Sequence, residues 1–131
     1  MLSTATAHPP HRGSYRDLPA WQRAMDLMAA CYALTRRLPE RDGLAARLQR
    51  ASLAVVASIA EGTGRRTRDQ RIHQLAAART SLLEVEALLC AAERLGCADA
   101  VELSALAAHV DETRRRLLSL ARAMGGGVRA D

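Results

Sequence analysis

The sequence predicts an all-α protein folded as an antiparallel, up-down-up-down four-helix bundle, on the basis of three observations. Alanine and leucine dominate the 131 residues and phenylalanine is absent, a composition that favours helix over strand. Apolar residues recur three and four positions apart along four segments. Breaks at Pro39, Gly62–Gly64 and Gly96 leave short connections, which join antiparallel neighbours.

A chain of this length suggests one domain. We expect a disordered tail over residues 1–14, the bundle over 15–124 and a flexible tail over 125–131 that begins with three glycines. The first segment has no apolar run long enough for a signal peptide or a membrane span. Cys31, Cys90 and Cys97 lack C-x-x-C spacing, which favours reduced thiols in the cytoplasm.

The first helix is expected to begin near Asp17–Pro19, with Asp17 as a cap and Pro19 in the first turn. Pro39 marks the turn that follows this helix. The apolar residues spaced three and four apart predict its core-facing positions. These are Leu18, Trp21, Met25, Met28 and Tyr32.

The second helix carries both a core face and an additional apolar face. Its core stripe consists of Leu44, Leu48, Ala51, Val55, Ile59 and Gly62. No residue from Ala51 to Ala60 is charged, and a helix that is apolar nearly all round is usually covered all round. We therefore expect copies of the chain to associate through Leu53, Val56, Ala57 and Ala60. The alternative is that an alanine-rich face simply tolerates solvent.

The third and fourth helices each begin with a sequence that can cap them. Thr67 and Gln70 have the spacing of a capping box, and Asp99 and Glu102 can cap the fourth helix. Gly96 is expected to stop the third helix. The third helix has its apolar repeat at Ile72, Leu75, Ala78, Leu82, Val85, Leu89 and Ala92. The fourth has Leu103, Leu106, Val110, Leu117, Leu120 and Met124.

Several short motifs follow one another along the chain. They are LPAWQ at 18–22, LT at 34–35 with LP at 38–39, LQRA at 48–51, IAEG at 59–62 with GR at 64–65, and Ala78 with SL at 81–82 and EVE at 84–86. Together they resemble the four-helix-bundle family named for open reading frames in intervening sequences of bacterial 23S rRNA genes. The resemblance covers about Tyr15 to Met124. Ser58 and Leu38 depart from it, since the family commonly has Asn and Phe there.

This resemblance implies a homopentamer of four-helix bundles, a form shared with related accessory variability determinant proteins of retroelements. Those relatives bind nucleic acid and a reverse transcriptase, so a reverse transcriptase is a candidate protein partner. The family brings no established reaction and no catalytic residues to carry over.

The distribution of charge independently suggests nucleic acid. Between Arg36 and Arg71 there are nine arginines and four acidic residues, so this segment accounts for the whole net charge of +5. Such a concentration attracts phosphate, and arginine suits bidentate phosphate contacts. Without interleaved aromatic residues, base stacking is not supported. The candidate nucleic-acid-binding residues are Arg47, Arg50, Arg65, Arg66, Arg68 and Arg71.

Two alternatives remain open for these arginines. They can be solvated or form ion pairs within or between subunits, as Asp111 and Glu112 are placed to do for Arg114–Arg116. The protein would then be an oligomeric scaffold that binds a protein partner, with no nucleic-acid role.

No enzyme, metal site or cofactor is predicted. Gly62-x-Gly64 follows a helix and lacks the pattern of a phosphate-binding loop. Glu84 and Glu86 face different directions, and Ser81 has no identifiable activating base. His73 and His109 have no neighbouring ligand residues at metal-site spacing. An unstructured pair such as His8 and His11 is too few for a metal site.

Overall fold

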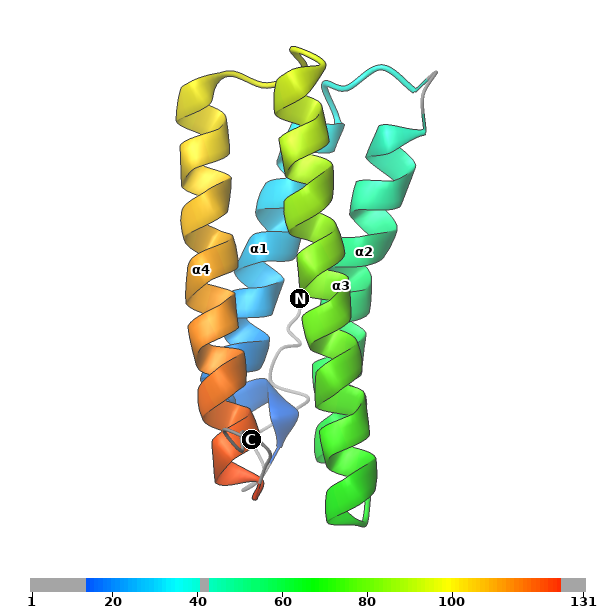
Figure 1. The fold of residues 1–131 in the computed structure, drawn as a ribbon, viewed down its shortest axis with the longest axis vertical. Helices are drawn as coiled ribbons and strands as arrows, with labels where there is room; N and C mark the ends of the chain where they lie inside the picture. The colour runs from blue at the N-terminus through cyan, green and yellow to red at the C-terminus, as the bar shows by residue number, and fades with distance from the viewer. Residues whose placement is uncertain (1–13, 41–42, 126–131) are drawn as a thin grey trace, which may run out of the picture.

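The computed structural model describes residues 14–40 and 43–125. They form a short 3₁₀-helix, η1 (Tyr15–Asp17), and four long helices. The long helices are α1 (Pro19–Thr35), α2 (Leu44–Thr63), α3 (Arg68–Arg94) and α4 (Ala100–Ala123). Within the described residues there is no strand, so the all-α prediction is confirmed (Figure 1). Most of both expected tails lies outside the described residues, namely 1–13 and 126–131. His8 and His11 are therefore also outside them.

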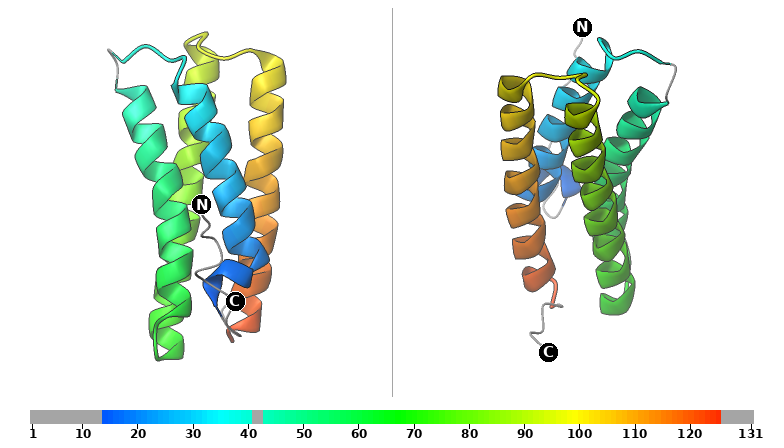
Figure 2. Two further views of the ribbon diagram at one scale, coloured as in Figure 1. Left: turned by 180° about the vertical axis from the view of Figure 1, so that it is seen from behind. Right: turned by 45° about the horizontal axis from the view of Figure 1, so that its top comes forward.

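The helices surround one core. α1 contacts α2 and α4, and α3 contacts the same two helices from the other side (Figure 2). The α1–α2 and α3–α4 connections lie at one end of the molecule, and the α2–α3 turn lies at the other (Figure 1). Consequently the two loops that flank α2 are separated by the length of that helix, about 30 Å for 20 residues.

The core positions predicted on α2 are confirmed, since all six residues of the stripe are buried. On α3 the predicted repeat is also buried from Leu75 to Ala92, with Ile72 partly buried. On α4 the fully buried group includes Thr113, which the apolar pattern did not identify. The Thr113 hydroxyl donates to the backbone oxygen of His109 at 2.8 Å, so burial leaves no hydrogen-bonding group unsatisfied there.

The predicted core face of α1 is wrong by about one residue. The five predicted positions are only partly buried. Small residues occupy much of the true contact, and their size lets α1 approach its neighbours while the larger side chains flank the seam. The buried residues of this helix are Ala20, Ala24, Leu27, Cys31, Leu34 and Thr35.

The capping predictions hold for two helices and fail for one. Both capping boxes are present, Thr67 with Gln70 and Asp99 with Glu102. α1 begins at Pro19 as expected, but its N-cap is Leu18, which has no side-chain cap. Asp17 is wrong as a cap because it lies inside η1.

Two residues that the sequence assigned to the tails make hydrogen bonds in the described structure. The hydroxyl of Ser14 accepts from the backbone N–H of Arg16 at 3.1 Å and so caps η1. The backbone oxygen of Gly125 accepts from Arg68 Nε at 2.7 Å. These two hydrogen bonds connect one residue at each end of the described structure to the helical region.

Gly96 ends α3 because its backbone is left-handed, with φ of +73°. The N–H of Cys97 donates to the oxygen of Ala92 at 2.8 Å, and the N–H of Gly96 donates to the oxygen of Glu93 at 3.0 Å. This pair of bonds satisfies the last carbonyls of the helix in the Schellman arrangement.

At Gly62 the backbone of α2 lies close to α3. A Cβ atom at this position would lie 3.2 Å from Leu75 Cδ2 and 3.3 Å from Gln74 Cβ. By contrast, a Cβ on Gly64 would lie 3.7 Å from its nearest neighbour, the backbone oxygen of Glu61. The absence of a side chain at Gly62 therefore sets how tightly the ends of the two helices pack.

Replacing Gly62 with valine should destabilise the fold by about 1–3 kcal/mol, because the added methyl groups overpack the α2–α3 contact. Urea unfolding followed by circular dichroism measures this. Gly64→Ala is the matched control and should change the free energy of unfolding by less than about 0.5 kcal/mol. Equal stability of Gly62→Val and the unmodified chain would show that the contact is looser than described.

The three cysteines should differ in reactivity. Cys31 is fully buried, and burial raises the pKa of its thiol to about 12, whereas Cys90 is exposed. At about pH 8–9 the buried Cys31 thiol therefore stays protonated and out of reach of the reagent, whereas the Cys90 thiol is accessible to it. Labelling with a thiol-specific reagent should therefore show a fast phase that Cys90→Ser removes and Cys31→Ala leaves unchanged. Loss of the fast phase in Cys31→Ala would contradict this.

Candidate nucleic-acid interface

The six candidate arginines do not form one cluster. Arg47 and Arg50 lie in the first half of α2, whereas the other four surround the α2–α3 turn. Arg47 and Arg65 are therefore roughly 25 Å apart along the helix axis. Arg36 and Arg37, which the charge count included, lie beyond the opposite end of α2, where Arg37 pairs with Glu102. The charge excess that is continuous in sequence is thus divided between two ends of the molecule.

Arg47 forms an ion pair across the helices. Its Nη2 lies 2.9 Å from Glu84 Oε2 on α3. The ion-pair alternative therefore holds for Arg47. Arg50 is exposed and has no carboxylate of the described residues within 4.0 Å, so its charge is uncompensated there.

Arg68 and Arg71 hold backbone around the α2–α3 turn. Arg68 Nε donates to the oxygen of Gly125 at 2.7 Å, which ties the start of α3 to the end of α4. Arg71 Nη1 donates to the oxygens of Arg66 at 3.1 Å and Arg65 at 3.4 Å, which braces the turn itself. A carbonyl oxygen accepts a hydrogen bond without cancelling a full charge, so both guanidinium groups still contribute positive potential.

Arg65 and Arg66 lie on the braced turn with exposed side chains. Neither is paired with a carboxylate among the residues that the structure describes. Arg65 also lines an open pocket of about 370 Å³ whose other walls come from the first turns of α3. These walls are Asp69, Gln70, His73 and Gln74.

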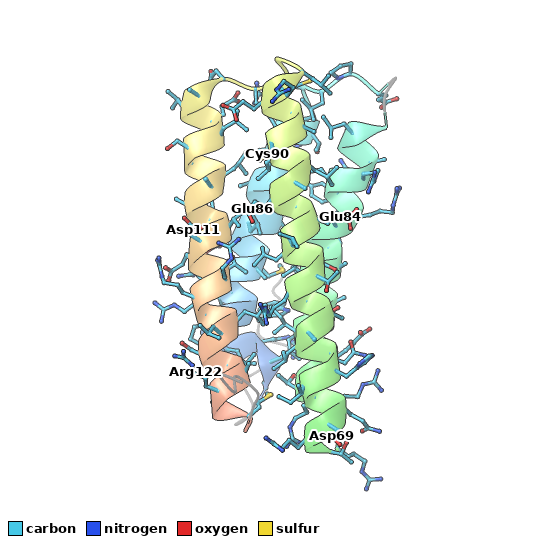
Figure 3. The ribbon with its side chains drawn as sticks, in the orientation of Figure 1. Asp69, Glu84, Glu86, Cys90, Asp111 and Arg122 are labelled. Carbon is cyan, nitrogen blue, oxygen red and sulfur yellow. The ribbon has the colours of Figure 1, made fainter. Side chains whose placement is uncertain are left out.

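We call the four arginines of this region the arginine end, defined as Arg65, Arg66, Arg68 and Arg71. The segment from residue 61 to 71 contains these four arginines and two acidic residues, Glu61 and Asp69, so it carries a net charge of +2. Arg122, in the last turn of α4, lies toward the same end of the molecule (Figure 3). The positive charge at this end of the molecule therefore comes from the arginine end and from the last turn of α4.

The other arginine run, Arg114–Arg116, is compensated as the sequence predicts. Arg114 contacts Asp111 at 2.8 Å and Glu86 at 2.7 Å. Arg115 and Arg116 both hydrogen-bond Glu112, and these bonds hold the pKa of the Glu112 carboxyl below its usual range. This run therefore offers little free charge to phosphate.

Glu84 and Glu86 face different neighbours, which confirms that they are not a carboxylate pair. Glu84 turns to Arg47 on α2, and Glu86 turns to Arg114 on α4 (Figure 3). Each carboxylate thus links α3 to a different helix.

The candidate self-association residues on α2 differ in exposure. Leu53 is 43% exposed, and Ala57 is exposed as well. Ala60 is half-buried, and Val56 is half-buried because it packs against the core of its own bundle. The outer face of α2 is therefore centred on Leu53 and Ala57.

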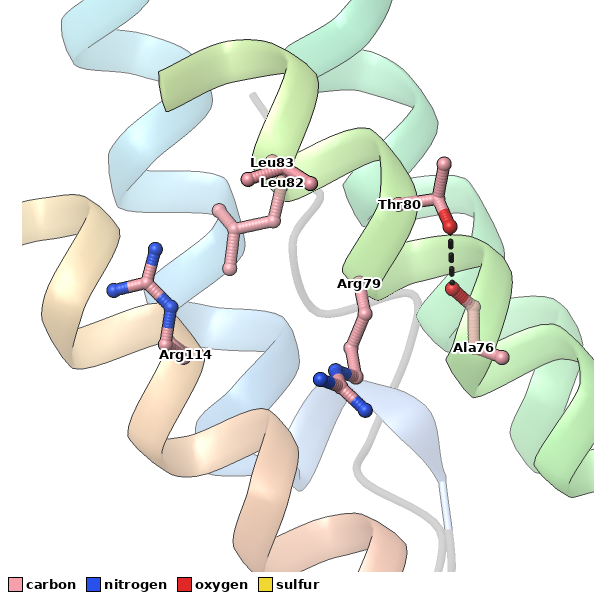
Figure 4. Close-up of a pocket in the computed structure, with 6 residues that line it drawn as sticks. All are labelled: Ala76, Arg79, Thr80, Leu82, Leu83 and Arg114. Atoms are coloured by element: carbon pink, nitrogen blue, oxygen red, sulfur yellow. Dashed lines mark hydrogen bonds between the residues drawn. The ribbon is translucent and has the colours of Figure 1, made fainter. Parts of the chain in front are cut away.

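A groove between α3 and α4 was not predicted from the sequence. It has a volume of about 310 Å³, and Arg79 from α3 and Arg114 from α4 lie on its two sides (Figure 4). Leu83, which is 64% exposed, lies at its rim. The available signal was the spacing of Ala76, Thr80 and Leu83, which are four and three residues apart and fall outside the core stripe.

In residues 14–40 and 43–125, no helix combines the length and the apolar character that crossing a bilayer requires. The same stretches contain no group of three or more histidine, cysteine, aspartate or glutamate residues placed to hold a metal ion.

A search of curated proteins found no match to the chain. A family model described as 23S rRNA-intervening sequence protein matches residues 16–119, which is most of the chain and nearly all of the four-helix region. The resemblance inferred from the short motifs is thereby confirmed. The chain belongs to the 23S rRNA-intervening sequence protein family.

Proposed function

We propose that the protein is a non-catalytic, homo-oligomeric accessory protein that binds RNA or DNA without sequence specificity. Each copy is an antiparallel up-down-up-down bundle, and five copies are expected from the family resemblance. The observation that carries the proposal is the pair Arg65 and Arg66, exposed and without a carboxylate partner among the described residues. The turn that bears them is braced by Arg71.

The arginine end is suited to the nucleic-acid backbone. Guanidinium groups bind phosphate oxygens bidentately, and the release of condensed counterions favours such contacts. Tyr15, Trp21 and Tyr32 are the only aromatic residues of the sequence, and none lies in the segment 61–71. Binding therefore depends on phosphate, with no stacking on bases.

Self-association strengthens this binding. One arginine end supplies only a few phosphate contacts, whereas several ends in one assembly engage the same strand with a high effective concentration. The outer face of α2 supports association, because Leu53 and Ala57 expose uncharged surface in a single copy. The three free cysteines fit a reducing cytoplasm as the site of action.

Replacing Arg65 and Arg66 together with alanine should weaken binding to a labelled single-stranded RNA and to a duplex DNA several-fold. The plot of log affinity against log salt should become shallower, by about 0.9 for each lost phosphate contact on the duplex. Fluorescence anisotropy at a series of salt concentrations measures both quantities. Light scattering should show an unchanged molar mass.

The matched control for this experiment is Arg115→Ala with Arg116→Ala, which removes the same formal charge from arginines that are bound to Glu112. The control should bind nearly as well as the unmodified chain. Equal losses in both double variants would mean that net charge alone attracts the nucleic acid. Absence of binding even at low salt would refute the proposal and favour the alternative, an oligomeric scaffold for a protein partner.

A further inference from the structure

The outer face of α2 has charge only at its two ends. Arg50 and Glu61 are eleven positions apart, which is about three helical turns, so they lie on the same side of the helix. Leu53 and Ala57 lie exposed between them. Neither Arg50 nor Glu61 has an oppositely charged side chain within 4.0 Å among the described residues. This face is an apolar ridge with one unpaired charge of each sign.

The groove between α3 and α4 has complementary features. Leu82 lies buried at its base and Leu83 lies exposed at its rim. A smaller pocket of about 60 Å³ continues along the same seam and shares Ala76 and Arg79 with the first. The surface is therefore an elongated depression between two helices, the shape that accepts the ridge of a third helix.

Two charged residues line the groove, Arg79 and Arg114, and Arg114 is paired with two carboxylates that lie beside the groove. Arg79 lies toward the arginine end, and it forms no ion pair with a described residue. Farther from that end, Glu86 and Asp111 share the single cation Arg114, so this cluster has an excess negative charge. Figure 3 shows Glu86 and Asp111 on the facing helices α3 and α4.

When two copies lie side by side in the same orientation, the charges on the outer face of α2 in one copy lie toward opposite charges around the groove of the other. On α2, Glu61 is the residue closer to the arginine end and Arg50 is the more distant one. In this orientation Glu61 lies toward Arg79 of the groove, and Arg50 lies toward Glu86 and Asp111. The opposite orientation brings like charges together, which disfavours it.

We propose that the α2 ridge of one copy docks into the α3–α4 groove of a second copy, with Leu53 entering the groove beside Leu83. This inference rests on the proposed homo-oligomer and specifies its contact. The ridge and the groove are different surfaces of one bundle, so the contact is head-to-tail. Repetition of such a contact closes a ring when the rotation between copies allows it.

Two single substitutions test the contact, Leu53→Arg on the ridge and Leu83→Arg in the groove. Both side chains are exposed in one copy, so each variant should keep its helical circular dichroism, which shows that the bundle still folds. Sedimentation should show that each variant alone is monomeric. Val101→Arg, at a residue that is 79% exposed outside the groove, should retain the mass of the unmodified chain.

Mixing the two monomeric variants distinguishes a head-to-tail contact from a symmetric one. The Leu53→Arg copy still has an intact groove, and the Leu83→Arg copy still has an intact ridge. An equimolar mixture at high micromolar concentration should therefore form a one-to-one dimer that grows no further. A mixture that stays monomeric would overturn the proposed pairing of these two surfaces.

Exchange of charges provides a second test that does not depend on the leucines. Glu61→Arg should reduce assembly by placing two cations together, and adding Arg79→Glu in the same chain should restore it. If the unmodified chain is oligomeric but Leu83→Arg or Arg79→Glu has no effect, the docking is wrong and self-association stands. If the unmodified chain is itself monomeric, the homo-oligomer and the docking both fall.

Discussion

The close packing of α2 against α3 is the constraint on which the rest of the structure depends. At Gly62 the two helices approach so closely that a Cβ atom would lie 3.2 Å from Leu75. The turn that follows is short, and Arg71 holds two of its carbonyl oxygens. As a result Arg65 and Arg66 are held at the end of the bundle with their side chains in solvent. The same packing turns the opposite side of α2, with Leu53, outward.

The arginines divide into three groups by their partners, and this division decides which of them are available to a ligand. Arg47 and Arg114 are paired with glutamates of α3 and join the helices. Arg68 and Arg71 are bound to backbone oxygens. Arg65 and Arg66 have neither kind of partner among the described residues, as is true of Arg50. Exposed ion pairs contribute little to stability, so the main consequence of this pairing is that the charges of Arg47 and Arg114 are compensated by carboxylates.

The sequence was sufficient to predict those features of the fold that depend on residues close together in the chain. The capping boxes at Thr67 and Asp99 depend on residues three positions apart. The buried stripe of α2 follows from apolar residues that recur at the helical period. On α1 two neighbouring stripes compete, and the larger side chains of Trp21 and Met25 indicated the wrong one. Alanines at Ala20 and Ala24 form the actual contact because small residues allow close approach, a property that hydrophobic pattern alone does not measure.

The candidate site was harder to predict than the fold because it depends on which residues the bundle brings together. The charge excess between Arg36 and Arg71 is continuous along the chain, yet α2 separates its two parts by about 30 Å. The groove beside Leu83 is formed by two helices, so the residue spacing on α3 alone does not define it. The charge of Arg68 makes it a candidate nucleic-acid-binding residue, while its hydrogen bond to Gly125 depends on residues 57 positions apart.

We propose that α2 serves two purposes, since its inner face packs in the core of the bundle and its outer face binds other copies of the chain. Sedimentation equilibrium of the full chain over a range of micromolar concentrations tests this most directly. We predict a single species that contains two or more copies of the 14.2 kDa chain. A mass of 14.2 kDa at every concentration would contradict it.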